Sequence, residues 1–185
     1  MKMACCIPLL AVMTACVSMA PQYSAAPQNV MRLREGGLEP VTVGDFTVAP
    51  GHVKESESLS IRGSRYLSPY ENSFAKYLQE ALRAELAEAR LLNPRSAIEL
   101  TGVLVRNELN AAGFVTANAL IEARFVVKRD GAVRYDQVLS SRAEWDSHFI
   151  GAVAIPRAQE NYPMAVRQLL AKLYADPAFN AALLK

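Results

Sequence analysis

The sequence predicts an α+β fold, a two-layer sandwich in which two amphipathic helices cover one face of a mainly antiparallel sheet of four or five strands. Apolar residues recur at helical spacing in residues 70–91 and again in residues 157–174. Between them, residues 97–145 alternate apolar and polar side chains, which is the period of half-buried strands. One apolar sheet face and two apolar helix stripes are all buried when the helices pack on that face.

The first half of this fold is expected to contain a strand at residues 40–48, a weaker one at residues 59–67, and then the first helix. That helix should begin at Ser68, whose hydroxyl can accept from the free N–H groups of the first turn while Glu71 returns a hydrogen bond. It should end before Pro94, which disfavours helical geometry in the preceding residue.

The second half is expected to be a meander of three strands followed by the second helix. Residues 97–109 and 115–127 carry the first two alternating patterns, and the second of these is the clearest in the chain. Asp130-Gly131 supplies the positive φ angles of a tight hairpin turn, and residues 133–145 form the returning strand. The expected order is therefore β-(β)-α-β-β-β-α.

Composition argues against several partners and chemistries. The chain has 20 basic and 18 acidic side chains, so its near-neutral charge gives no electrostatic reason to expect nucleic acid as a partner. All three cysteines lie at or before Cys16. The body of the protein after Cys16 therefore offers no thiol, disulfide or cysteine metal ligand.

The first sixteen residues have the order of a secretory signal. Basic Lys2 is followed by an apolar run at residues 3–12 and then by Met13-Thr14-Ala15-Cys16. We interpret residues 1–15 as a signal peptide, because the run is shorter than the ~20 residues that span a bilayer. The ending on Cys16 resembles a bacterial lipobox, in which the peptide is cut before the cysteine.

This resemblance implies a lipid anchor. The thiol of Cys16 would carry a diacylglycerol and its amino group an acyl chain such as palmitate, with no other cofactor. No Asp follows the cysteine, and by the lipoprotein sorting rule this implies the outer membrane, with the protein facing the periplasm. The rival is cleavage after Ala20, which would leave Pro21 unfavourably at the new N-terminus.

Residues 16–39 are expected to be the lipidated cysteine and a flexible tether. Residues 17–29 are rich in Ala, Ser, Pro and Gln, a composition that buries too little apolar surface to order itself. Residues 40–185 would then form a single periplasmic α+β domain. Such a tether would let the domain swing above the membrane.

Candidate catalytic residues are few. His52 and His148 are the only histidines, and neither belongs to a metal-ligand motif, so we expect no metal site. Asp146-Ser147-His148 contains the residue types of a catalytic triad, but triad members converge from separate parts of a chain. We therefore expect a protein that is not an enzyme. The alternative is a hydrolase or transferase that uses His148 with Glu144 or Asp146.

Other polar and aromatic residues have ordinary interpretations. Glu85 and Glu88 lie on the predicted first helix and are interpreted as a solvated face. Tyr66, Tyr70 and Tyr77 are of a type favoured in interface hot spots. We interpret these tyrosines as surface and core-edge residues.

One apolar run has two interpretations. Residues 149–155 contain no polar side chain, and since most such runs are buried, we expect core beneath the second helix. The alternative is an exposed lip that contacts lipid or a protein partner. The candidate contact residues are then Phe149, Ile150, Val153 and Ile155.

The lipobox, the predicted tether and the element order together resemble a group of small Gram-negative envelope lipoproteins. These are the YajG-like lipoproteins and, more loosely, the auxiliary lipoproteins of lipid-transport ABC systems. The motif is confined to residues 13–16, whereas the pattern extends over residues 41–179. The resemblance implies a non-enzymatic binding or assembly accessory, whose partners are the membrane and envelope proteins or lipids. A structural lipoprotein without a defined ligand is the remaining alternative.

Overall fold

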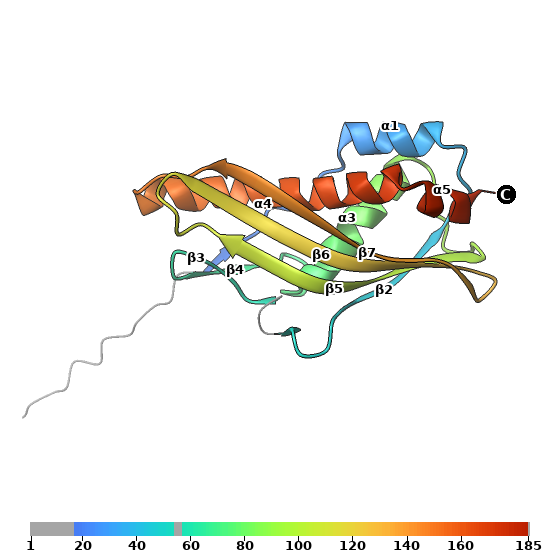
Figure 1. Cartoon of the computed structure of the whole chain (residues 1–185), viewed down its shortest axis with the longest axis horizontal. Helices are drawn as coiled ribbons and strands as arrows, with labels where there is room; N and C mark the ends of the chain where they lie inside the picture. Colours follow the sequence, from blue (N-terminus) through green and yellow to red (C-terminus); the bar gives the residue numbers. More distant parts are fainter. Residues whose placement is uncertain (1–16, 54–56, 185) are drawn as a thin grey trace, which may run out of the picture.

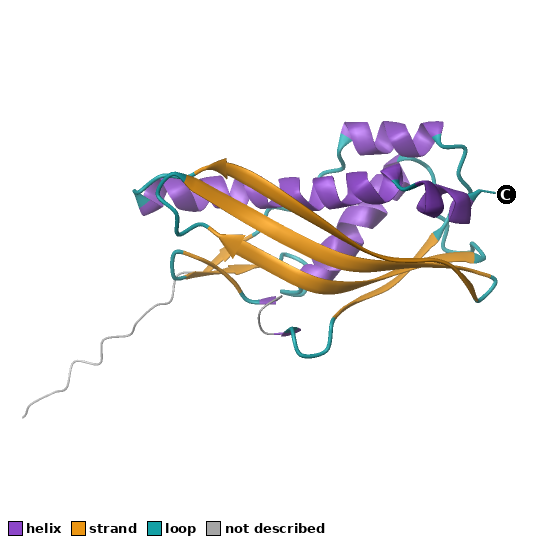
Figure 2. Cartoon of the chain, viewed as in Figure 1, coloured by secondary structure: helices purple, strands orange, loops and turns teal. Residues whose placement is uncertain are grey.

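The main sheet has four strands in the order β2-β5-β6-β7, in a computed structural model that describes residues 17–53 and 57–184. Strands β5, β6 and β7 form an antiparallel meander, and β2 pairs with β5 in parallel. Figure 2 shows these strands as one twisted layer beside the helices. The strands are β2 (Thr42–Val48), β5 (Ile98–Asn110), β6 (Thr116–Arg129) and β7 (Ala132–Asp146). The predicted α+β sandwich is confirmed.

Two long helices pack on this sheet. Helix α3 (Phe74–Glu88) contacts β2 and β5, whereas α4 (Gly151–Ala175) contacts β6 and β7. The short helix α5 (Pro177–Leu183) follows α4 and packs against β7. Each fully buried Leu, Val or Phe between the layers contributes about 1.5–3 kcal/mol. Such side chains include Leu78, Leu82, Leu86, Phe125, Val127, Val166, Leu169 and Leu173.

The expectation of a flexible tether over residues 16–39 is wrong for the described residues, 17 onward. Strand β1 (Val17–Met19) pairs with the main body of the protein, and helix α1 (Pro27–Glu35) packs on α3 and α4. Figure 1 shows α1 as an outer layer over α4. Composition misled because Tyr23, Val30 and Leu33 of this polar segment are buried against the rest of the protein.

A small second sheet has three strands in the order β1-β4-β3. Strands β3 (Leu59–Ile61) and β4 (Ser64–Leu67) form a hairpin where one weak strand was expected. The two turn residues, Arg62 and Gly63, have φ angles of 50° and 84°. A two-residue turn of this kind needs positive φ at both positions, which Gly63 supplies without strain.

Both long helices begin elsewhere than predicted. Helix α3 starts at Phe74, capped by Ser73, whose Oγ accepts from the Lys76 N–H. The predicted capping box at Ser68 does not form, because Glu71 has a φ of 54° and lies outside the helix. Helix α4 starts at Gly151 rather than 157. It continues past two internal prolines because its inner face is buried, with Ala154, Ala158, Tyr162 and Val166.

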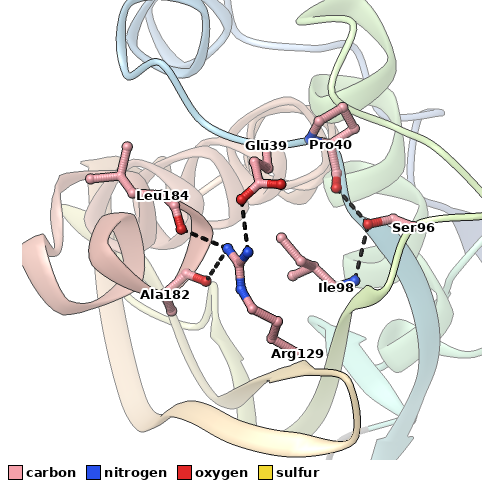
Figure 3. A network of polar contacts seen from close by, with 7 residues as sticks. All are labelled: Glu39, Pro40, Ser96, Ile98, Arg129, Ala182 and Leu184. Carbon is pink, nitrogen blue, oxygen red and sulfur yellow. Dashed lines mark hydrogen bonds and ion pairs between the residues drawn. The ribbon is translucent and has the colours of Figure 1, made fainter.

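Arg129 joins three segments at the end of the sheet where β6 turns into β7. Its guanidinium donates to the Glu39 carboxylate at 2.7 Å and to the carbonyl oxygens of Ala182 and Leu184 at 3.3 and 2.7 Å (Figure 3). The Glu39 N–H donates in turn to the Leu183 carbonyl. These contacts hold the C-terminal helix against the entry to β2.

Close packing between β2 and β5 depends on a missing side chain. Phe46 is the register partner of Gly102, and its ring occupies the space where a Gly102 Cβ would lie. The same ring is buried and packs edge-on against Phe125, with centroids 6.2 Å apart. Phe46 therefore has no free space into which it can move.

Replacing Gly102 with Ala should lower the free energy of unfolding by about 1–3 kcal/mol, the usual cost of overpacking a core. Chemical denaturation of the purified protein measures it. The control is Gly151→Ala, because a Cβ there would meet only Ile155 Cδ1, at 4.0 Å. Equal stability of the two variants would contradict this account of the β2–β5 contact.

Candidate functional site

Large apolar side chains are exposed together at one end of the molecule. Phe114 and Val115, in the β5–β6 loop, are 72% and 76% exposed, and Phe149 and Ile150, between β7 and α4, are 67% and 46% exposed. Figure 1 shows both connections at the same end of the long strands. We call these four side chains the apolar tip. Exposed apolar clusters on soluble domains mark interaction sites.

Arg62 holds the two loops of the apolar tip together. From the β3–β4 turn, its guanidinium donates to the carbonyl oxygens of Ala111 and Gly113 in one loop, at 2.9 and 3.2 Å. It also donates to those of His148 and Phe149 in the other, at 2.6 and 2.8 Å. The loops are thus fixed by a charged group that bonds only to backbone, which leaves their apolar side chains facing out.

The predicted run at residues 149–155 is divided between surface and core. Phe149 and Ile150 are exposed, so the favoured interpretation as core is wrong for them. Val153 and Ile155 lie half-buried in the first turns of α4, and Ile155 packs against the core. Because the helix begins at Gly151, the helical period places Ala154 in the core while Ala152 is exposed.

Sequence reasoning missed Phe114 and Val115. Residues 111–115 connect two strands and contain no polar side chain. Surface connections normally carry Asn, Asp, Ser or Pro beside their glycines. The absence of such residues was the signal that could have identified this loop, but Val115 had been assigned to the strand.

His148 is placed to shape its loop. Its ring stacks on Phe149 with centroids 4.7 Å apart, and its Nδ1 accepts a hydrogen bond from the Ile150 N–H at 3.1 Å. Glu144 is instead bonded to Arg142 at 2.8 Å. The geometry therefore brings His148 to backbone and an aromatic ring, and does not assemble it with Glu144 into an acid–base pair.

The start of the described chain lies beside the apolar tip. Val17 pairs in parallel with Arg65, three residues after the Arg62 that holds the two loops. Cys16, the predicted lipidation site, and the signal peptide lie outside the described residues. Residue 16 nevertheless joins Val17 through one peptide bond, a Cα–Cα step of about 3.8 Å.

A buried carboxylate fixes the segment between β1 and α1. Glu85, expected on a solvated face, is fully buried under this segment. Its Oε1 accepts from the Tyr23 hydroxyl at 2.6 Å, the Ala26 N–H at 3.1 Å and the Asn29 amide at 3.1 Å. Burial raises the pKa of Glu85 above its usual value of 4.5, and these hydrogen bonds oppose that rise.

Two of the three tyrosines near the start of α3 belong to the core, so the interpretation as surface and core-edge residues is wrong for Tyr66 and Tyr77 and holds only for Tyr70. Tyr66 and Tyr77 are fully buried, and their rings pack with those of Phe74 and Tyr162. The Tyr77 hydroxyl donates to the Pro21 carbonyl at 3.1 Å, a further contact to the first described segment. Tyr70 is half-buried at the edge of this cluster.

A solved structure with the same fold is found by comparison. Protein XCC0632 from Xanthomonas campestris, described as a member of family DUF330, aligns with a TM-score of 0.59 at 14% identity, over 90% of this chain and 97% of that one. The two proteins share a fold. A minor lipoprotein from Acinetobacter baumannii aligns with a TM-score of 0.45 at 12% identity, over 78% and 93% of the two chains, which is too distant to support a conclusion.

Neither family models nor curated proteins match the sequence. Within residues 17–53 and 57–184, no helix combines the length and apolar character needed to cross a bilayer. Over the same ranges, no group of three or more His, Cys, Asp or Glu side chains is placed to hold a metal ion. The features on which a function can be argued are therefore the apolar tip and its position beside Val17.

Replacing Arg62 with Met should loosen both loops of the apolar tip. Removing a charged donor from these four carbonyls costs about 2 kcal/mol, and amide hydrogen exchange should become faster in residues 111–115 and 147–150. Arg65→Met is the control, because Arg65 is exposed on the neighbouring strand. Unchanged exchange in Arg62→Met would mean that the loops hold themselves in place.

Replacing Glu85 with Gln should change how stability depends on pH. A pKa raised in the folded state adds stability below the unfolded value near 4.5, and this contribution is lost as pH rises through the folded pKa. The wild type should therefore become less stable relative to Glu85→Gln as pH rises above about 4.5. Denaturation at several pH values measures the difference. Glu88→Gln, at an exposed position of α3, should show no such trend.

Proposed function

We propose that this protein is a lipid-anchored lipoprotein of the cell envelope, acylated at Cys16, that acts as a non-enzymatic binding or assembly accessory. The observation that carries the proposal is the folded state of the residues directly after Cys16. Val17–Met19 form β1, and Ala20 is buried with its N–H bonded to the Leu67 carbonyl. Cleavage before Cys16 preserves this strand.

The rival cleavage site is disfavoured by the same contacts. A cut after Ala20 would remove the whole of β1 and leave the edge of β4 unpaired. Unpaired strand edges invite aggregation. Lipid attachment at Cys16 therefore agrees with both the sequence motif and the fold, whereas a chain that starts at Pro21 agrees with neither.

The location proposed is the outer membrane, with the body of the protein in the periplasm. It is supported by the sequence after the cysteine, Val17-Ser18, which contains no Asp. An accessory role, in the transport of lipid or another envelope component, is supported by the resemblance to auxiliary lipoproteins and by the apolar tip. Exposed clusters of apolar side chains are typical of binding surfaces.

Mass spectrometry of the protein purified from its native membrane should find a mature chain that starts at an acylated Cys16. The added mass should correspond to a diacylglycerol and one further acyl chain. A Cys16→Ser variant should lose this mass and appear in the soluble fraction. An unmodified chain that starts at Pro21 would overturn the proposal.

The accessory role has a separate test. The acylated protein, solubilised in mild detergent, should copurify with a defined envelope complex, and the variant Cys16→Ser should recover much less of it, because it is no longer held at the membrane. Consistent isolation as a lone monomer would favour the alternative of a structural lipoprotein. Turnover of a substrate by the purified protein, lost in His148→Ala, would instead favour the enzyme.

A further inference from the structure

We propose that the apolar tip inserts into the surface of the same bilayer that holds the Cys16 lipid, so that the domain sits at the membrane in one fixed orientation. The partner of this site is thus the lipid surface itself. The inference rests on the proposed acylation of Cys16, and it adds a second contact that the acylation does not require.

The first argument is the chemistry of the two loops. Residues 111–115 and 149–155 contain no polar side chain, although both connect elements at the surface. Phe114, Val115 and Phe149 are each about two-thirds exposed or more. Aromatic and aliphatic side chains of this kind gain from transfer out of water into the interfacial layer of a bilayer.

The second argument is the distance to the anchor. Val17 lies opposite Arg65, and Arg62 of the same hairpin bonds to both loops of the tip. The acyl chains on Cys16 therefore leave the protein at the end where the apolar side chains point outward. A short link of this kind keeps the tip at a high effective concentration against the lipid surface.

The third argument is that no flexible linker follows Val17. Because Val17 is already paired and the following segment is held by Glu85, no free linker separates Cys16 from the folded domain. A domain without a linker cannot be lifted far from its anchor. A protein partner at the tip would have to fit between the domain and the bilayer, so a lipid surface is the occupant that the geometry favours.

The charges around the tip agree with a lipid surface. Residues 58–67, 111–115 and 147–155 contain no acidic side chain, and exposed Arg65 lies beside Val17. One acidic side chain lies at the margin of the tip, exposed Asp146 at the end of β7. Basic side chains next to an apolar insertion are attracted by anionic headgroups, and acidic ones would be repelled. No charged residue stands between Phe114 and Val115 or between Phe149 and Ile150 in the sequence.

The test uses the acylated full-length protein in vesicles of phosphatidylethanolamine and phosphatidylglycerol. The mature body has no free thiol after acylation, so a single added cysteine takes one environment-sensitive fluorophore. Phe149→Cys reports on the tip. The control is Val133→Cys, which is 56% exposed but lies at the β6–β7 turn, roughly 40 Å away along the strands.

The probe at 149 should shift to the blue and be quenched by nitroxide-labelled lipids, whereas the probe at 133 should do neither. Equal quenching at both positions would indicate a domain that tumbles over the surface and would overturn the inference. So would a probe at 149 that stays in water on vesicles and is shielded only when a soluble periplasmic protein is added, because the tip would then bind protein.

A second measurement separates the tip from the anchor. The unacylated Cys16→Ser protein should bind the same vesicles weakly, and Phe114→Ser with Phe149→Ser should lower that partitioning by about tenfold. The paired control, Val133→Ser with Val138→Ser, removes apolar side chains of β7 that are 56% and 52% exposed and should leave the partitioning unchanged. A wild-type protein that carries no lipid on Cys16 would contradict the proposed function. Equal vesicle binding by both double variants would contradict only the insertion of the tip.

Discussion

The arrangement of the whole chain depends on the hydrogen bonds that a single buried carboxylate accepts. Glu85 of α3 is buried beneath the first described residues. It accepts hydrogen bonds from Tyr23 and Ala26, which precede α1, and from Asn29 in the first turn of α1. A buried carboxylate without such donors would be costly, and buried donors without the carboxylate would be equally so. Helix α3 and the first described segment therefore require each other. The contact joins residues about sixty positions apart, and it decides whether the first residues are a linker or part of the fold.

This contact has consequences at the surface. Because Tyr23 and Asn29 are fixed, β1 can reach β4, and Val17 stays opposite Arg65. The same hairpin presents Arg62 to the backbone of two loops that would otherwise be free to collapse onto the core. A sequence of local contacts thus runs from a buried acid to an exposed apolar surface. Glu85 and Arg62 both hold backbone in place through hydrogen bonds. The apolar side chains of the tip are not covered by the rest of the protein.

The sequence predicted those parts of the fold whose pattern is set by their own immediate surroundings. The alternation in β6 is of this kind, because one buried face imposes a period of two residues. The Asp130-Gly131 turn is also of this kind, because its positive φ angles favour these residue types. The start of α3 was missed because Ser68 and Ser73 carry similar local signals, and Glu71 and its neighbour adopt positive φ between them. The burial of Glu85, the order of residues 17–39 and the exposure of Phe149 could not be predicted. Each depends on partners far away in the sequence, which no local period reveals.

In the proposed arrangement, a short connection between the Cys16 anchor and the sheet would give the domain a defined height as well as an orientation. Strands of 13–15 residues run from the apolar tip toward the turn beside Arg129, and a strand rises about 3.3 Å per residue. With the tip in the bilayer surface, the Arg129 end lies roughly 40 Å above it. The groups that fasten this far end, Glu39 and the carbonyls of Ala182 and Leu184, are already bonded to Arg129. In the proposed orientation, a partner in the periplasm would meet this end or the outer face of the sheet, whereas the apolar tip would face the lipid.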